Sequence, residues 1–177
     1  MESTRGLIHI YCGDGKGKTT AAFGLGMRCA GRHEKVLIVQ FMKGQDSGEL
    51  HTVARIPEIH LLRNTFSDKF VFQMDQTEKQ TVRMKNDEML AKVDVLLHAT
   101  AYRMLILDEV LSAWELDMLD HQALLHMITH RPPEVEVIMT GRNPPQELTD
   151  LADYISEIRS IRHPYDQGIP ARRCIEF

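Results

Sequence analysis

Short apolar runs alternate along the chain with longer stretches in which apolar residues recur at helical spacing. The runs are predicted to be β-strands at residues 7–12, 36–41, 59–62, 104–107 and 135–140. Two of them contain the sequences VLIV and MLIL, which are apolar at every position. Continuous apolar runs are typical of parallel strands that are covered on both faces. The pattern therefore predicts a buried, mainly parallel sheet.

Helical patterns occupy the intervals between these runs, at residues 18–31, 76–98, 120–130 and 145–154. Asp75 and Glu78 have the spacing of a capping box at the start of the longest one. Strands that alternate with helices predict an α/β fold, a doubly wound sheet with helices on both faces. Ligands of such folds bind at the carboxyl ends of the strands, so polar residues there are the candidates for chemistry.

The turn after the first predicted strand carries the strongest chemical signal. Residues 12–20 read CGDGKGKTT and lead into a helical pattern of small residues. Strand, glycine-rich turn, Lys-Thr and helix form the context of a P-loop, in which backbone amides and a helix N-terminus surround phosphate groups. Cys12 stands where the full motif has its first glycine. The sequence predicts a nucleoside triphosphate site in a P-loop NTPase-like fold.

Within this loop, Lys18 is expected to reach the β- and γ-phosphates and the Thr19 hydroxyl to ligate Mg²⁺. A dinucleotide fingerprint does not fit, because Lys18 stands where that motif needs glycine or alanine for close packing. The residues expected to bind the triphosphate are Gly13, Asp14, Gly15, Lys16, Gly17, Lys18, Thr19 and Thr20.

Two further strands end in residues that suit a phosphate site. Asp108 and Glu109 follow the MLIL run, where a P-loop protein places the carboxylate that serves Mg²⁺ directly or through water. The sequence leaves open which of the two is the inner ligand. Arg142 follows the strand at 135–140, where its guanidinium could pair with phosphate oxygens; the alternative is a solvent-exposed arginine in a turn.

Three phenylalanines, Phe66, Phe70 and Phe72, lie close together between the third predicted strand and the long helix. Composition alone favours core packing for them. The functional alternative is an apolar wall for a large flat ligand.

Size and charge narrow the classes of protein further. The chain has 177 residues and a net charge of −4, so we expect one domain over residues 1–177, with no nucleic acid and no anionic membrane as a partner. Three widely spaced cysteines suit reduced thiols rather than a disulfide framework. No apolar run has the length of a membrane span or a signal peptide, so we expect a cytoplasmic protein.

Five segments together resemble the P-loop type of ATP:corrinoid adenosyltransferase. They are GDGKGKTTAAFGLG at 13–26, VLIVQFMKG at 36–44, LILDEVLSAW at 105–114, RPPEVEVIMTGRNPPQEL at 131–148 and HPYDQGIPARRCIEF at 163–177. The resemblance covers nearly the whole chain. The last two segments carry more of it than the P-loop, which many unrelated NTPases share.

This resemblance implies a reaction in which cobalt(I) of a corrinoid attacks C5′ of ATP and inorganic triphosphate leaves, in the biosynthesis or salvage of adenosylcobalamin. ATP would lie reversed in the P-loop relative to ordinary NTPases. The implied substrates are ATP and a corrinoid, with Mg²⁺ as cofactor. The implied partners are an electron-donating reductase or flavodoxin-like protein and a second copy of the chain in a homodimer.

The resemblance also assigns residues to steps. Lys18 and the loop carry over to triphosphate binding, Thr19 and Glu109 to Mg²⁺, and Arg142 to phosphate contact. Better-known members of the family have a Phe-Thr-Trp element in the region of Phe70 and Phe72, so displacement of the lower axial ligand of cobalt is transferred to these two side chains as a hypothesis. Those members also have an N-terminal extension over the active site, whereas barely a dozen residues precede the P-loop here.

Two other functions fit a P-loop. A small-molecule or nucleoside kinase would release ADP, and a nucleotide-binding regulator would release ADP with phosphate or nothing. The phosphate product therefore discriminates among the three.

Overall fold

The six strands found in the described part of the chain form one parallel sheet. The computed structural model describes residues 5–44, 46–64 and 71–175. The strand order is β3-β2-β4-β5-β1-β6, and every neighbouring pair runs parallel. The strands are β1 (Ile8–Cys12), β2 (Val36–Gln40), β3 (Ile59–Arg63), β4 (Met104–Asp108), β5 (Glu136–Thr140) and β6 (Tyr154–Glu157). The expected α/β class with a parallel sheet is confirmed.

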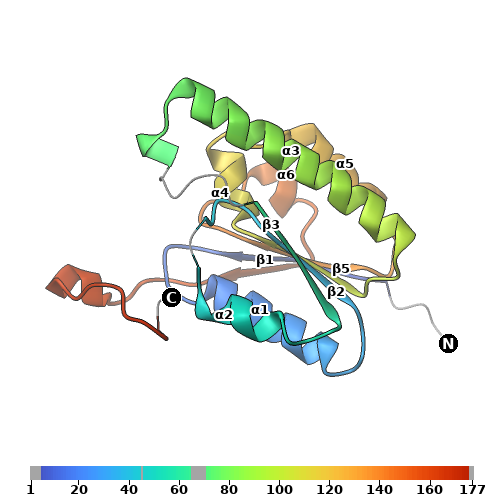
Figure 1. Ribbon diagram of the computed structural model, residues 1–177, viewed down its shortest axis with the longest axis horizontal. Helices are drawn as coiled ribbons and strands as arrows, with labels where there is room; N and C mark the ends of the chain where they lie inside the picture. The colour runs from blue at the N-terminus through green and yellow to red at the C-terminus, as the bar shows by residue number, and fades with distance from the viewer. Residues whose placement is uncertain (1–4, 45, 65–70, 176–177) are drawn as a thin grey trace.

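Helices cover both faces of this sheet (Figure 1). Helices α1 (Lys18–Ala30) and α2 (Gly48–Val53) lie on one face. The other face carries α3 (Gln76–Ala99), α4 (Val110–Glu115), α5 (His121–His130) and α6 (Gln146–Thr149). Two short 3₁₀ turns, η1 (Val71–Gln73) and η2 (Pro164–Gln167), complete the structure. No described helix combines the length and the apolar character needed to cross a membrane.

The alternation of side chains along the strands divides the core into two layers. Ile38, Ile106 and Ile138 are in register across β2, β4 and β5, and they pack with Ala22 and Phe23 of α1. The neighbouring position in each strand points to the opposite face, where the larger cluster includes residues of α3, α4 and α5. Full burial of each such side chain contributes about 1.5–3 kcal/mol, so both layers hold the strand ends in fixed positions.

The predicted strands are confirmed to within a residue or two, and three of the four helices likewise. The predicted helix at 145–154 is wrong in its second half, because α6 ends at Thr149 and Tyr154 begins β6. The Asp153 backbone amide donates to Ile8 O, and the Asp153 carboxylate accepts from the Ile8 amide. These bonds fix the chain to β1 as a sixth strand, which the sequence pattern did not predict.

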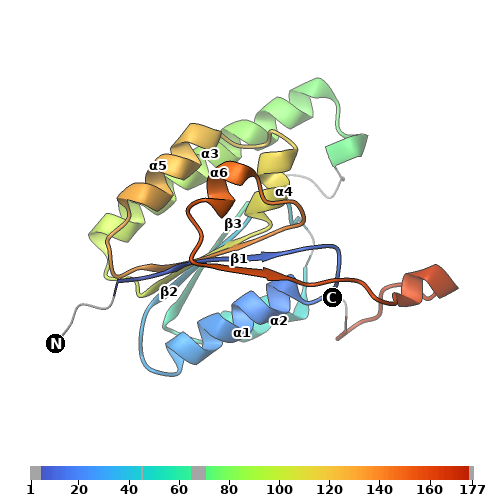
Figure 2. The same ribbon diagram turned by 180° about the vertical axis from the view of Figure 1, so that it is seen from behind.

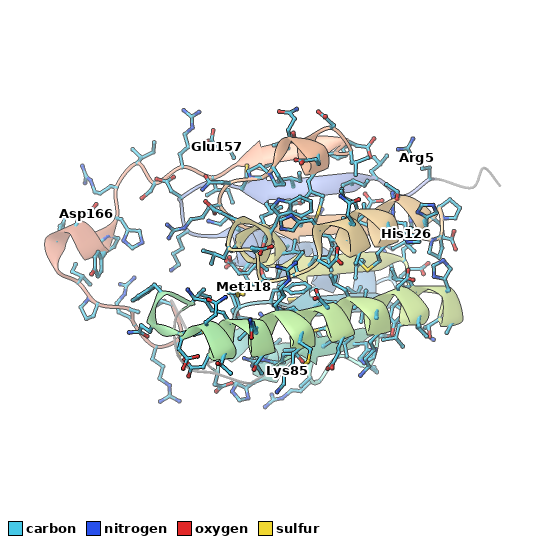
Figure 3. All side chains as sticks on the ribbon, turned by 90° about the horizontal axis from the view of Figure 1, so that it is seen from above. Arg5, Lys85, Met118, His126, Glu157 and Asp166 are labelled. Atoms are coloured by element: carbon cyan, nitrogen blue, oxygen red, sulfur yellow. The ribbon has the colours of Figure 1, made fainter. Side chains whose placement is uncertain are left out.

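Beyond β6 the chain forms a tail, residues 158–175, that leaves the sheet and returns (Figures 1 and 2). The tail projects past the carboxyl ends of the strands, with η2 at its far tip. Figure 3 shows Glu157 at the end of β6 and Asp166 of η2 well beyond the sheet. The tail is therefore on the same side of the molecule as the residues that end β1, β4 and β5.

Gly141, directly after β5, should tolerate no side chain. Its φ is +154°, and a Cβ there would lie 2.4 Å from Leu111 Cβ and 2.9 Å from the Ser112 nitrogen. We expect Gly141→Ala to lower the free energy of unfolding by at least about 2 kcal/mol, measured by urea denaturation. Gly24→Ala is the matched control, because nothing lies within 4 Å of the position that a Cβ would take at this residue of α1. That control should raise stability by about 0.5–1 kcal/mol; equal effects of the two substitutions would contradict the steric argument.

Candidate active site

The P-loop is shaped by glycines at its two ends. Gly13 has φ +103° and Gly17 has φ +120°, conformations that L-residues with a Cβ rarely adopt. Backbone hydrogen bonds hold the loop between the segments after β5 and β6: Gly13 N donates to Arg142 O at 3.0 Å, and Gly15 N donates to Ile158 O at 2.8 Å. The loop conformation therefore depends on two segments that are distant in sequence.

Lys18 lies across this loop. Its Nζ donates hydrogen bonds to the carbonyl oxygens of Gly13 at 2.7 Å and Gly15 at 2.8 Å. The helix α1 begins at this residue, directly after Gly17. A positive charge and the N-terminal end of a 13-residue helix thus meet at one point, which favours an anion there.

Asp108 is the centre of a buried polar network at the end of β4. Its side chain has no exposed surface. Oδ1 accepts hydrogen bonds from the hydroxyls of Thr19 at 2.9 Å and Thr140 at 2.8 Å. Oδ2 accepts from Gln40 Nε2 at 3.1 Å and from Lys43 Nζ at 2.7 Å. A buried carboxylate requires such partners, since an unpaired charge in the interior is strongly destabilising.

Glu109 has a different environment from its neighbour. Its φ is +61°, in the left-handed region, and its backbone amide donates to Thr140 Oγ1 at 2.9 Å. The carboxylate accepts a hydrogen bond from the Ser112 hydroxyl at 2.6 Å and lines a cavity above the P-loop. A non-glycine residue in this backbone region costs about 1–2 kcal/mol, and such strain is concentrated at functional sites.

The cavity has a volume of about 360 Å³ and lies beside the P-loop. It is lined by Gly15, Lys16, Gly17, Lys18, Thr19, Thr20, Lys43, Gly48, Glu49, Glu109, Cys174 and Ile175. The lining includes three lysines and two glutamates. The excess of positive charge suits an anionic ligand, and the carboxylates suit a cation bound together with it. The tail forms one wall, where Lys16 Nζ donates to Ile175 O at 2.9 Å.

The oxygen atoms at this cavity suit Mg²⁺. Thr19 Oγ1, the Glu109 carboxylate and the buried Asp108 carboxylate are hard oxygen donors of the kind Mg²⁺ prefers. Gln40 Oε1, beside Asp108, is buried and accepts no hydrogen bond from any described residue, which leaves one further acceptor at the site. No cluster of three or more His, Cys, Asp or Glu side chains among the described residues could hold a metal ion alone. Mg²⁺ commonly uses one or two protein oxygens together with substrate phosphates.

Not every predicted residue lines the cavity: the described ones that do not are Gly13, Asp14, Asp108, Arg142 and Phe72. Arg142 is exposed; its carbonyl supports Gly13, and its side chain is not part of the cavity lining. The Ser160 amide, which donates to Asp14, lowers the pKa of Asp14, and the charges of Lys18 and Arg142 lower it further. Phe72, in η1, is 80% exposed and also lies outside the lining. Phe70 falls outside the described residues, as does Phe66.

Three residues of the network were missed from the sequence: Gln40, Lys43 and Thr140. Each stands at or just after the carboxyl end of a strand next to β4. Asp108 and Arg142 were selected because they lie at the carboxyl ends of predicted strands, and these three positions meet the same criterion. The available signal was Gln40, a polar residue directly after the VLIV run.

Comparison with known proteins shows which family this chain resembles along its length. The family model described as "ATP:corrinoid adenosyltransferase BtuR/CobO/CobP" matches residues 4–177. The corrinoid adenosyltransferase of Escherichia coli (strain K12) is 32% identical over 178 residues, which cover 99% of this chain and 88% of the relative. Corrinoid adenosyltransferase CobA of Salmonella typhimurium is 33% identical over 190 residues, with the same two coverages.

One solved structure, described as the cytoplasmic domain of EssC, superimposes with a TM-score of 0.54. The superposition covers 97% of this chain and 37% of that chain at 19% sequence identity. At this identity the likeness shows the fold alone.

Two cysteines near the P-loop differ in exposure, and this difference can be tested by chemical labelling. Cys174 is exposed at the cavity, whereas Cys12 is buried at the end of β1 and burial raises the pKa of its thiol. We expect a disulfide reagent at pH 8 to label Cys174 at least about tenfold faster than Cys12, because the thiolate is the reactive form. Peptide mass analysis identifies the labelled residue. The variant Cys174→Ser should lose the fast phase, and denatured protein should label all three cysteines; fast labelling of Cys12 would contradict the placement of β1.

Proposed function

Because the chain belongs to the ATP:corrinoid adenosyltransferase family, we propose that it transfers the 5′-deoxyadenosyl group of ATP to cobalt(I) of a corrinoid in adenosylcobalamin biosynthesis or salvage. The observation that carries the proposal is the match of the family model to nearly the whole chain. The cavity lined by P-loop residues is consistent with it. The product assay described below tests the alternative, a small-molecule or nucleoside kinase.

The proposed reaction is a displacement at carbon. An electron pair of cobalt(I) forms the cobalt–carbon bond to C5′ while the bond between C5′ and the α-phosphate oxygen breaks. The electrons of that bond leave on inorganic triphosphate, and cobalt becomes formally cobalt(III). No phosphoryl group is transferred, so the enzyme needs to align the two substrates and to stabilise charge on the leaving group.

The P-loop supplies the groups for that charge. We assign triphosphate binding to residues 13–20, with Lys18 as the principal cation. The assignment is supported by the position of the Lys18 ammonium between the Gly13 and Gly15 carbonyls. When bound, Mg²⁺ would neutralise part of the charge that develops on triphosphate.

We assign Mg²⁺ to Thr19, Glu109 and Asp108. Direct contact through Glu109 is supported by its carboxylate at the cavity, whereas Asp108 is enclosed by four hydrogen-bond donors. Asp108 would then act by holding the Thr19 hydroxyl in place. Arg142 is proposed to contact phosphate only after its exposed side chain turns toward the P-loop, with which its backbone is already in contact.

Two further assignments follow from the chemistry of cobalt. Cobalt(I) must be generated from a more oxidised corrinoid, so we propose an electron-donating reductase or flavodoxin-like partner and a role for Phe70 or Phe72 in removing the lower axial ligand.

We also propose one catalytic domain over residues 1–177, a cytoplasmic location and a homodimer. The exposed strand β6 at the edge of the sheet, with Tyr154 and Ile155 each about half exposed, supports a protein contact there.

The first test is the product formed under anaerobic conditions from ATP, Mg²⁺ and chemically reduced cob(I)alamin. We expect a photolabile alkylcorrinoid in the visible spectrum and one triphosphate per corrinoid. Lys18→Ala should lower the rate by about 10²–10³-fold, as expected when a preorganised donor to the leaving group is lost. Lys92→Ala, on the exposed surface of α3, is the matched control and should retain the wild-type rate. Formation of ADP without inorganic phosphate would instead indicate a kinase, and ADP with phosphate, or intact ATP, would indicate a regulator.

The phenylalanine hypothesis requires a comparison of two starting states of cobalt. Phe70→Ala and Phe72→Ala should slow the reaction that starts from cob(II)alamin and a reductant, because the lower ligand must leave before cobalt(II) is reduced. Both should react normally with cob(I)alamin prepared in advance. Tyr165→Ala removes an exposed aromatic ring from η2 and serves as the control. Wild-type rates for both variants from cob(II)alamin would exclude these side chains from ligand displacement.

A further inference from the structure

Lys43 forms the ion pair that neutralises Asp108. Its Nζ lies 2.7 Å from Asp108 Oδ2 and 2.9 Å from Thr19 Oγ1. The Asp108 carboxylate is fully buried, whereas the Lys43 side chain is 31% exposed and lines the cavity. The ammonium therefore lies at the boundary between the buried network and the space expected to receive triphosphate.

The backbone around Lys43 has contacts of its own, separate from those of the side chain. The preceding residue, Met42, has φ +57°, and Arg63 Nη2 donates to the Lys43 carbonyl at 3.0 Å. These contacts fix the base of the side chain at the carboxyl end of β2. Four flexible methylene groups separate that base from the ammonium, so the charge can move while the backbone stays in place.

The position of the ammonium conflicts with a divalent cation at the same oxygens. A hydroxyl has one proton to donate and two lone pairs that accept. Thr19 donates its proton to Asp108 Oδ1, and one lone pair accepts from Lys43. Mg²⁺ on Thr19 would approach within a few ångströms of the ammonium, and like charges at that distance repel each other more strongly near a partly buried site than in bulk water.

We propose that Lys43 is an internal cation that occupies the metal side of the network in the nucleotide-free protein and moves to the triphosphate when Mg²⁺ binds. The inference rests on the proposed function of the P-loop. Removal of the ammonium without replacement would leave Asp108 as an uncompensated buried charge. Exchange of Lys43 for Mg²⁺ keeps that carboxylate paired in both states, and the displaced ammonium gains a phosphate partner in the same cavity.

This exchange makes metal and triphosphate binding cooperative. A metal ion alone must displace Lys43 with no phosphate to receive it, so its binding is weakened. Triphosphate alone must draw Lys43 away from Asp108 with no metal ion to replace it there, so its binding is weakened as well. Each ligand therefore favours the other, and the coupling is reciprocal by thermodynamic linkage.

The substitution Lys43→Gln separates the two effects, because glutamine is neutral and its amide can still donate to Asp108. We expect Mn²⁺ alone, followed by electron paramagnetic resonance, to bind about tenfold more tightly to the variant than to the wild type. We expect inorganic triphosphate in the presence of EDTA, followed by calorimetry, to bind about tenfold more weakly. The opposite signs distinguish the exchange from structural damage, which would weaken both ligands.

Two variants serve as controls for this experiment. Lys92→Gln changes the same residue type on the exposed surface of α3 and should leave both affinities unchanged. Lys18→Ala should abolish triphosphate binding. If wild-type protein binds no triphosphate, the proposed function fails and the inference fails with it. If the wild type binds and Lys18→Ala does not, while Lys43→Gln changes neither affinity by more than twofold or weakens both, the inference alone is overturned.

A measurement on the wild type keeps the test decisive even if Lys43→Gln does not fold. Crystal structures with and without Mg²⁺ and ATP should differ in one distance. Lys43 Nζ should remain paired with Asp108 Oδ2 in the nucleotide-free form and lie beyond about 4 Å, the limit of an ion pair, in the loaded form. An intact Lys43–Asp108 pair beside bound Mg²⁺ would overturn the exchange.

Discussion

The buried charge of Asp108 is the constraint that organises the carboxyl edge of the sheet. Its two oxygens accept hydrogen bonds from residues on α1, on and after β2 and on β5, so one side chain joins the elements on both sides of β4. Removal of one partner from such a buried pair typically costs about 3–5 kcal/mol. The strand ends are consequently held together by the same group that is proposed to position the Thr19 hydroxyl for Mg²⁺, so a substitution of Asp108 would be expected to affect stability as well as function.

Backbone strain is concentrated at the same edge. Gly13, Gly17 and Gly141 have positive φ angles there, and so does the non-glycine residue Glu109. Glycine adopts such conformations readily, whereas at Glu109 the conformation reduces stability and persists only where the surroundings determine it. The two apolar layers of the sheet provide that determination, since β2, β4 and β5 are nearly without exposed side chains. A rigid sheet thus carries a loop geometry that no short segment would adopt alone.

The sequence predicts the parts of the fold whose physical cause is local. Apolar runs marked the buried strands, and glycines with Lys-Thr marked the P-loop. Strand β6 was not predicted, because its four residues are all exposed. Its position depends on the hydrogen bond between Asp153 and Ile8, which are 145 positions apart. Lys43 was not predicted as a site residue for a similar reason, since its partner Asp108 lies 65 positions away in the sequence. Conversely, Arg142 was singled out correctly as a residue at the sheet edge, yet a strand end fixes the direction of the backbone and not that of a long exposed side chain.

The departure of the P-loop from the full motif has a structural explanation. Cys12, at the first glycine position, is paired with Glu157 of β6 as the last residue of strand β1, and a strand residue needs no positive φ. The left-handed conformation occurs one residue later, at Gly13, where a Cβ would lie 2.4 Å from Ile158 O. The Gly15 amide donates to that same oxygen. The segment after β6 therefore imposes the start of the loop, and it permits cysteine where the motif alone would demand glycine.

Since the tail that continues from this segment also forms a wall of the cavity, the C-terminal part of the chain helps to determine both the shape of the phosphate loop and the space above it.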